Sequence, residues 1–277
     1  MAETEAEADG ERREHPVPEE RTRQHALTLR EFARQSETFE NSALNGAFTR
    51  HLERLADFTG AGPEDVCLDS ACGTGIVARA LAARTRHVTA LDLTPEMLAS
   101  GKAEADGLGL RNLVFQRGEA ERLPFLDGSF TLVVSRYALH HVPEPGRVAA
   151  ELVRVCRRGS RVVVADMVLD PTAPGEPDLW ERLRDPSHGT LLTADRIEEL
   201  LAAAGGTPER REVFDMPRPL LPWLEQARTP SAAAERITRA LEAELAGDGE
   251  ATGLRPLRVE GALWFTQTLA HVAVTVA

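Results

Sequence analysis

The chain has 277 residues, 42% of them hydrophobic, which is enough for one α/β domain with an added lid. Asp and Glu number 44 against 32 Lys and Arg, and the resulting net charge of −12 argues against nucleic acid as a partner. The three cysteines suggest no disulfide framework, and we find neither a signal peptide nor an apolar run that could span a bilayer, so we expect a cytoplasmic protein without membrane insertion.

Residues 1–20 are rich in Glu, Arg and Pro and have almost no large apolar residues, which predicts a solvated, disordered tail. Residues 21–47 then place apolar side chains at helical spacing, with Gln24 and Gln35 between them. We expect N-terminal helices here, which either pack on the core or form a lid over a binding site. A further amphipathic helix is predicted over residues 51–58.

A glycine turn follows the first predicted strand, which ends near Asp69. Gly73 and Gly75 lack the Cβ atoms that would keep a nucleotide away from the backbone, and the helix that follows offers unpaired N–H groups. The turn satisfies the G-x-G-x-x-A dinucleotide fingerprint. Asp92, which ends the next predicted strand, could hold ribose hydroxyls at a spacing near the ~20 residues of NAD sites. An ordinary glycine turn without a ligand is the alternative.

Asp69 distinguishes between two cofactors that fit this turn. A carboxylate ahead of the glycines can pair with an ammonium group. NAD has no ammonium group at that place, whereas the amino-acid half of S-adenosylmethionine has one. The sequence therefore favours S-adenosylmethionine over NAD.

The third predicted strand, residues 112–117, ends before Gly118, Glu119 and Ala120. Glu119 could accept a hydrogen bond from an adenine amino group, while a nearby backbone N–H bonds a ring nitrogen. An acid after a strand is common, so this motif supports a cofactor site only together with the motifs that end at Asp69 and Asp92 earlier in the chain.

Four polar side chains, Arg136, Tyr137, His140 and His141, follow the fourth predicted strand, residues 130–135. They lie at the carboxyl end of a strand, where open α/β sheets bind ligands. One histidine could act as a general base, and Arg136 could bind an anionic substrate. Alternatively, one histidine packs in the core and the other caps a helix. Adjacent histidines lack the i, i+3 or i, i+4 spacing of helical metal ligands, so we expect no metal site.

Alternating strands and helices continue with a helix predicted over residues 148–157 and a fifth strand over residues 161–166. This alternation predicts a doubly wound, mostly parallel sheet. Residues 218–248 interrupt it with an inserted helical cap, whose apolar stripe is expected to face the core or a second copy of the chain in a homodimer. The chain closes with a strand within residues 249–277.

Over residues 48–215 the sequence resembles the class I S-adenosylmethionine-dependent methyltransferases. It is most similar to the branch that includes the ubiquinone and menaquinone biosynthesis C-methyltransferases and many small-molecule methyltransferases. Ala71 replaces the usual first glycine, Thr131 stands where aspartate is usual, and residues 157–160 replace a Lys-Pro-Gly-Gly-like turn. The last two departures touch strand and turn ends, so cofactor binding is still expected. The segments that carry the resemblance are residues 68–75, 91–98, 118–125, 136–141 and 183–188.

The resemblance implies a seven-stranded, Rossmann-like α/β sheet with an antiparallel last strand. The cofactor-binding core is then expected over residues 48–217 and 249–277, with an N-terminal helical lid at 21–47 and the helical cap at 218–248. The implied reaction moves a methyl group from S-adenosylmethionine to a carbon, oxygen or nitrogen of a small organic acceptor, in secondary-metabolite or quinone-like biosynthesis, and leaves S-adenosylhomocysteine. The cofactor-binding residues assigned on this basis are Asp69, Ala71, Gly73, Gly75, Asp92, Leu93, Met97, Gly118, Glu119, Ala120 and Ser135.

Two rival functions are compatible with these motifs. The first is a methyltransferase-fold protein that keeps the cofactor for structure and acts as a cyclase or a binding module, since a fold does not fix a function. The second is an NAD-dependent oxidoreductase, against which Asp69 and residues 118–125 argue. The catalytic candidates, chosen by position alone, are Arg136, Tyr137, His140 and His141, with His188 in a later loop.

Overall fold

The computed structural model describes residues 18–41, 43, 44, 46, 49 and 51–277. The tail predicted over residues 1–20 lies outside this set as far as residue 17, and helix α1 (Pro18–Phe39) already begins at Pro18. α1 forms the first part of the helical segment predicted over residues 21–47. Residues 42, 45 and 47 of that segment lie outside the described residues.

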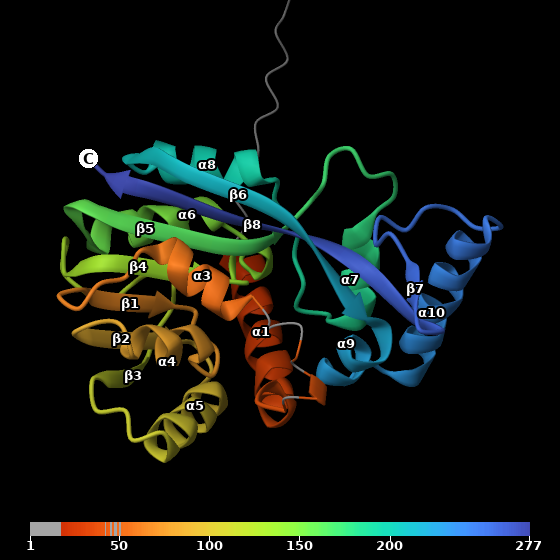
Figure 1. The fold of residues 1–277 in the computed structure, drawn as a ribbon, viewed down its shortest axis with the longest axis horizontal. Coiled ribbons are helices and arrows are strands. Elements are labelled where there is room, and N and C mark those ends of the chain that lie inside the picture. Colours follow the sequence, from red (N-terminus) through yellow and green to blue (C-terminus); the bar gives the residue numbers. More distant parts are fainter. Residues whose placement is uncertain (1–17, 42, 45, 47–48, 50) are drawn as a thin grey trace, which may run out of the picture.

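One sheet forms the centre of the molecule (Figure 1). The order of its strands is β3-β2-β1-β4-β5-β8-β6, in which β1 to β5 run parallel and β8 runs antiparallel to both β5 and β6. This confirms the predicted doubly wound, Rossmann-like sheet with an antiparallel last strand. A short strand that the sequence did not predict, β7 (Leu257–Val259), pairs with β8. Along the chain, these strands are β1 (Val66–Ser70), β2 (His87–Asp92), β3 (Leu113–Arg117), β4 (Phe130–Arg136), β5 (Cys156–Val168), β6 (Gly206–Pro219) and β8 (Ala262–Val276).

Helices cover both faces of the sheet (Figure 1). Leu55 and Leu81 are buried against one face, and Leu152 and Ile197 are buried against the other. The helical spacing of such apolar residues gives each helix one face that packs on the sheet. The first face carries α3 (Leu52–Thr59), α4 (Ile76–Ala82) and α5 (Pro95–Gly107), and the second carries α6 (Pro145–Val155) and α8 (Ala194–Ala203).

β6 and β8 extend out of the sheet into a lobe (Figure 1). Their pairing begins at Gly206 with Val276 and continues to Pro219 with Trp264. Within the lobe, the ring centroids of Trp223 and Phe265 lie 4.5 Å apart. Ile237 and Leu241, from the apolar stripe of the predicted cap, are buried in the same cluster. The helices of the lobe are α7 (Pro177–Arg184), α9 (Leu220–Gln226) and α10 (Ser231–Ala246).

The fifth strand begins earlier than predicted. The sequence placed residues 148–157 in a helix, but α6 ends at Val155 and β5 starts at Cys156. The reason is that the backbone of Cys156 is extended, with ψ of 138°, and this residue pairs with Phe130 of β4. The helix prediction was therefore wrong at Cys156 and Arg157.

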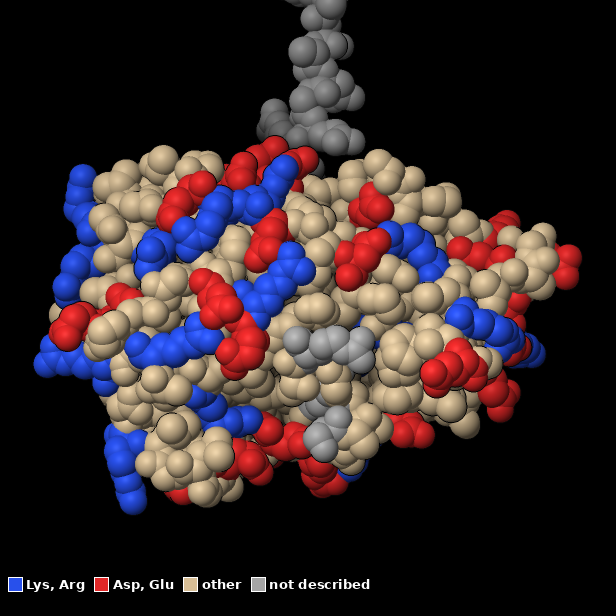
Figure 2. Space-filling view, viewed as in Figure 1, with Lys and Arg blue, Asp and Glu red and all other residues tan. Residues whose placement is uncertain are grey.

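Charged side chains of both signs are interspersed over the face shown in Figure 2. This pattern agrees with the acidic net charge of −12 and gives the visible face no broad basic patch. In the part of the chain that the structure describes, no helix combines the length and the apolar character needed to cross a membrane.

Candidate functional site

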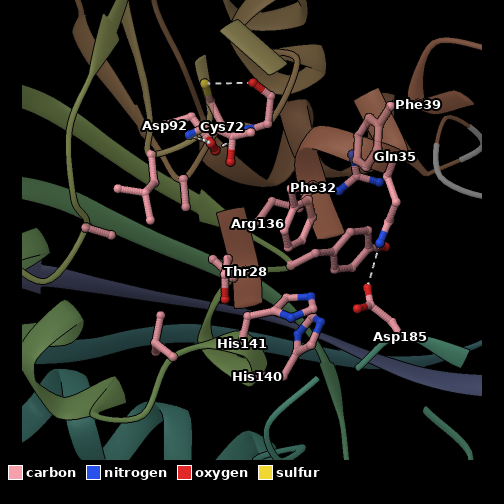
Figure 3. Close-up of a pocket in the computed structure, with 18 of the residues that line it drawn as sticks. Thr28, Phe32, Gln35, Phe39, Cys72, Asp92, Arg136, His140, His141 and Asp185 are labelled. Atoms are coloured by element: carbon pink, nitrogen blue, oxygen red, sulfur yellow. Dashed lines mark hydrogen bonds between the residues drawn. The ribbon is translucent and has the colours of Figure 1, made fainter. Parts of the chain in front are cut away.

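A deep pocket lies at the carboxyl ends of β1, β2 and β4, beneath α1 (Figure 3). It encloses about 1330 Å³ of empty space, its open mouth included. The predicted site residues that line it are Asp69, Ala71, Gly73, Asp92, Leu93, Gly118, Glu119, Ala120, Arg136, Tyr137, His140 and His141.

Gly75, Met97 and Ser135, which were also assigned to the cofactor, lie behind the pocket wall. Gly75 is the N-cap of α4 with φ of 73°, and a Cβ atom there would lie 2.8 Å from Cε1 of Phe115. Met97 is fully buried in α5, and the side chain of Ser135 is buried at the end of β4. Their positions suit them to shape the wall from behind.

Asp69 caps the helix that follows the glycine turn. Its Oδ2 accepts a hydrogen bond of 2.9 Å from the N–H of Ala78, because Gly75 at the N-cap has no side chain to do so. Burial raises the pKa of Asp69 to about 7, although the Ala78 N–H and the charge of Arg136 both act to lower it. The carboxyl group therefore changes charge near neutral pH.

Asp92 ties the glycine turn to the end of β2. Its Oδ2 accepts from the N–H of Gly73 and its Oδ1 from the N–H of Thr94, both at 2.8 Å. Burial raises the pKa of Asp92, and these hydrogen bonds oppose the shift. A carboxylate has about four lone-pair sites, so each oxygen can still accept one hydroxyl hydrogen.

His140 forms a buried pair with Asp166 at the end of β5. Nδ1 of His140 lies 2.6 Å from Oδ1 of Asp166, whose two oxygens also accept from the N–H groups of Leu139 and Met167. Burial alone would lower the pKa of His140, but the Asp166 carboxylate outweighs it and raises the pKa above its ordinary value. This carboxylate also fixes the proton on Nδ1, which leaves Nε2 as the basic nitrogen.

Sequence reasoning missed the role of Asp166, although a signal for it existed. Asp69, Asp92 and Asp166 all lie at the carboxyl ends of strands that were predicted to be parallel. Because such ends share one edge of a sheet, the third acid could have been assigned to the site together with the first two.

The pKa of His141 is shifted in the opposite direction from that of His140. Its Nδ1 lies 3.0 Å from the carbonyl oxygen of Ser187, and its ring meets Phe32 edge-on with centroids 4.9 Å apart. Burial, followed by repulsion from His140, lowers the pKa of His141 far below its ordinary value, so this ring stays neutral. Figure 3 shows the two histidines side by side at the edge of the pocket.

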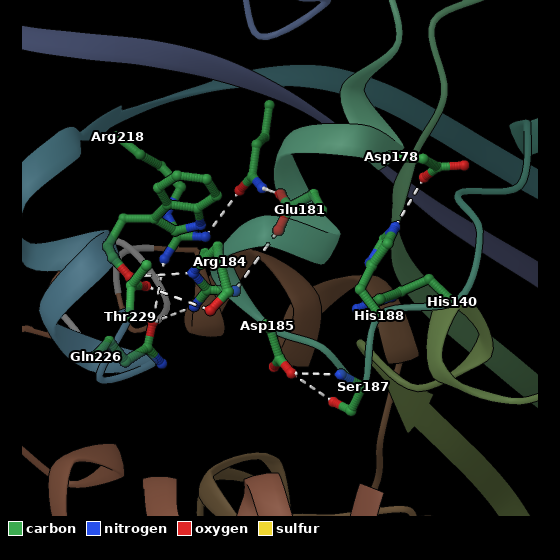
Figure 4. Close-up of polar contacts among 12 residues, drawn as sticks. His140, Asp178, Glu181, Arg184, Asp185, Ser187, His188, Arg218, Gln226 and Thr229 are labelled. Carbon is green, nitrogen blue, oxygen red and sulfur yellow. Dashed lines mark hydrogen bonds and ion pairs between the residues drawn. The ribbon is translucent and has the colours of Figure 1, made fainter. Parts of the chain in front are cut away.

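Residues from the lobe complete the pocket wall. Arg184, Asp185, Arg218 and Gln226 line it. Arg184 and Asp185 belong to the segment 183–188 that carries the resemblance, and Arg218 and Gln226 belong to the predicted cap, but the sequence analysis gave none of the four an individual role. Figure 4 shows that they come from the end of α7, from β6 and from α9. These segments are far apart in the sequence, and the motifs there did not indicate which of their side chains would meet in one wall.

His188, the remaining base candidate, lies behind His140. Its Nε2 lies 2.7 Å from Oδ1 of Asp178, and its ring centroid is 5.5 Å from that of His140 (Figure 4). His188 is buried and does not line the pocket. Its geometry suits packing against the His140–Asp166 pair better than contact with a substrate.

α1 lies over the pocket and is joined to both of its sides. Phe32 lines the pocket from above. Nε2 of Gln35 donates to Oδ2 of Asp185 at 2.8 Å, and Nε2 of His25 lies 2.9 Å from Oε2 of Glu121. The first contact joins α1 to the lobe, and the second joins it to the loop after β3.

Within the described residues, no group of three or more His, Cys, Asp and Glu side chains is arranged to hold a metal ion. The polar groups of the pocket are instead carboxylates near its glycine turn and histidine and arginine side chains elsewhere along its wall. Such a distribution provides separate sites for a cofactor with amine and hydroxyl groups and for a second ligand.

Residues 68–164 match the family described as methyltransferase domain. The chain is 30% identical to the uncharacterized methyltransferase YcgJ of Bacillus subtilis over 61% of this chain and 68% of that protein. It is also 30% identical to the 27-O-demethylrifamycin SV methyltransferase of Amycolatopsis mediterranei, over 74% of this chain and 76% of that enzyme. The crystal structure of the B. subtilis YcgJ protein superposes with a TM-score of 0.70 at 23% identity and covers 83% of this chain and 99% of that one.

Proposed function

Because the chain belongs to the class I S-adenosylmethionine-dependent methyltransferases, we propose that it transfers a methyl group from S-adenosylmethionine to a hydroxyl oxygen of a small organic acceptor. The observation that carries the choice of oxygen is the buried His140–Asp166 pair at the pocket. The name of the Amycolatopsis relative, which denotes an O-demethylated compound, supports the same choice. Carbon and nitrogen acceptors, and a place in secondary-metabolite or quinone-like biosynthesis, belong to the wider proposal.

The pocket residues fit the cofactor group by group. Asp69 suits the ammonium group, the two oxygens of Asp92 suit the ribose hydroxyls, and Glu119 suits the adenine amino group. Gly73, with φ of 56°, lets a ligand approach the turn without a Cβ atom in the way. When bound, S-adenosylmethionine supplies a methyl group already activated by a positively charged sulfur.

The chain's own contribution is then to position the acceptor and to remove a proton. In the proposed step, Nε2 of His140 would take the hydroxyl proton of the acceptor, and the acceptor oxygen would gain the methyl group as the methyl–sulfur bond breaks. Asp166 holds Nδ1–H of the ring and stabilises the imidazolium that results. α1 excludes water from above, which favours methyl transfer to the acceptor.

We assign the cofactor to the core at residues 48–217 and 249–277, and the acceptor to the boundary with the cap at residues 218–248 and the helical segment at 21–47. Arg218 and Gln226, which line the pocket, support the cap's part in this division. Membership of a methyltransferase family argues against the oxidoreductase alternative, and we infer that the glycine turn holds S-adenosylmethionine rather than NAD. The cyclase or binding-module alternative predicts a product without an added methyl group or no product, so the identity of the product distinguishes it from the proposal.

The test is turnover with methyl-labelled S-adenosylmethionine and a panel of hydroxylated aromatic and polyketide acceptors, with products identified by mass spectrometry. His140→Asn keeps a donor for Asp166 but has no second ring nitrogen. We expect its kcat/KM to fall by roughly 10²-fold or more, with unchanged binding of S-adenosylhomocysteine. His87→Asn, a substitution at the amino end of β2 away from the pocket, is the matched control and should keep full activity. Full turnover by His140→Asn, or a product without an added methyl group, would contradict the proposal.

A further inference from the structure

His141 lines the pocket beside His140, and the proposed proton transfer does not use it. The ring centroids of the two histidines lie 4.2 Å apart, and their planes are tilted by 43° (Figure 3). The backbone sets this arrangement, because both residues belong to the short 3₁₀ helix Leu139–His141. The pocket wall therefore offers a second imidazole next to the one that is proposed to act as the base.

Contacts with the protein fix the proton of each ring on Nδ1. Nδ1 of His140 lies 2.6 Å from Oδ1 of Asp166, and Nδ1 of His141 lies 3.0 Å from the carbonyl oxygen of Ser187. Both partners are acceptors, so each Nδ1 carries the hydrogen that it donates. In a neutral imidazole the other nitrogen is then an acceptor, which applies to Nε2 of both rings.

The two Nε2 atoms are available to a ligand. Among the residues that the structure describes, neither atom has a hydrogen-bond partner, and neither belongs to the fully buried polar atoms that lack one. Burial, followed by repulsion from His140, lowers the pKa of His141, so its Nε2 stays an acceptor at neutral pH. Covering such an acceptor without offering it a donor is unfavourable, so a bound ligand should place a donor there.

We propose that the methyl acceptor carries two neighbouring hydroxyl groups, one facing Nε2 of His140 and the other facing Nε2 of His141. His140 takes the proton of the first hydroxyl, whose oxygen gains the methyl group as the methyl–sulfur bond breaks. The second hydroxyl keeps its hydrogen and donates it to His141, which holds the acceptor in place. Phe32 and Met167, which line the same pocket, are suited to contact an apolar body. The inference rests on the proposed function, since it names the class of acceptor: a vicinal diol on an apolar body.

This arrangement limits the reaction to one methylation. The product has an ether oxygen in place of the first hydroxyl and retains the second hydroxyl. For a second transfer, that hydroxyl would have to face His140, which would turn the ether oxygen toward Nε2 of His141. Two acceptors would then meet without a hydrogen between them, so we expect the monomethyl ether to bind poorly.

Calorimetric titration of the protein saturated with S-adenosylhomocysteine tests the diol without turnover. The probes are 2,3-dihydroxynaphthalene, 2-naphthol and 3-methoxy-2-naphthol, which share one apolar body. We expect the diol to bind at least roughly tenfold more tightly than either of the other two. Equal or tighter binding of 2-naphthol or of the ether overturns the proposal, as does the absence of diol binding up to about 1 mM.

Variants locate the effect. His141→Phe keeps a ring but has no acceptor nitrogen, so it should lower the affinity for the diol to that for 2-naphthol. The carbonyl of Ser187, which loses the hydrogen of His141, still accepts from Nε2 of Gln24 at 2.8 Å. His87→Phe makes the same exchange at the amino end of β2, away from the pocket, and as the matched control it should keep the full preference.

Binding of S-adenosylhomocysteine shows that each variant is folded, and His141→Leu takes the place of His141→Phe if the latter does not fold. A preference for the diol that survives in full in the folded variant would overturn the assignment to His141. The comparison of the three probes on the unaltered protein decides the proposal even without a variant.

The outcomes for diol and function are separable. Selective binding of the diol supports the inference even when no tested hydroxyl is methylated, a result that would count against the proposed reaction alone. Methylation of 2-naphthol as readily as of the diol, or conversion of the monomethyl ether to the dimethyl ether at the same rate, contradicts the inference and leaves the reaction intact.

Discussion

Cofactor affinity is expected to depend on pH through Asp69. Burial raises the pKa of this carboxyl to about 7 in the free protein. One unit below the pKa about a tenth of the groups are ionised, and one unit above it about nine tenths are. If the ionised form pairs with the cofactor ammonium, S-adenosylhomocysteine should bind roughly tenfold more tightly at about pH 8 than at about pH 6. The sign follows because the ammonium lowers the pKa of Asp69, so that binding releases a proton.

The assay is calorimetry across this pH range in two buffers of different ionisation heat, which also counts the protons released. Asp69→Asn keeps an oxygen for the N–H of Ala78 but has no charge to titrate, so its affinity should be weaker at high pH and nearly flat. Asp57→Asn, which removes an exposed acid on α3, controls for overall charge and should keep the slope. A flat wild-type profile, or a slope that survives in Asp69→Asn, would refute the role of this carboxylate.

Two further substitutions test the site and the turn. Asp166→Asn offers an N–H donor in place of the carboxylate acceptor of Nδ1 of His140. We therefore expect kcat to fall by roughly 10²-fold or more, while the binding of S-adenosylhomocysteine is unchanged. An unaltered kcat would remove the His140–Asp166 pair from the mechanism. Gly75→Ala places a Cβ atom 2.8 Å from the Phe115 ring at a positive φ and should lower the free energy of unfolding by about 1–3 kcal/mol in urea. Gly107→Ala, with nothing within 4 Å of its new atom, is the control, and equal losses in both variants would contradict the packing argument.

The sheet was predictable because its signals are local. Short apolar runs end at Asp69 and Asp92, each before a turn and a helix, and parallel topology brings such ends to one edge. The partner of His140 was not identified, because it depends on β5 lying beside β4. Arg184 and Arg218 share the pocket only because α7 and the end of β6 meet in the lobe beside the sheet, and no periodicity in the sequence encodes that contact.

The long antiparallel pair has a consequence for how ligands enter and leave. β6 and β8 contribute 14 and 15 residues, and their backbone ladder continues from one edge of the sheet into the lobe. The lobe cannot hinge away from the cofactor half without breaking that ladder. α1, by contrast, is held to the lobe by side-chain hydrogen bonds such as that from Gln35 to Asp185. Detachment of α1 would open the pocket by breaking such side-chain contacts, and it would leave the spacing between the sheet and the lobe unchanged.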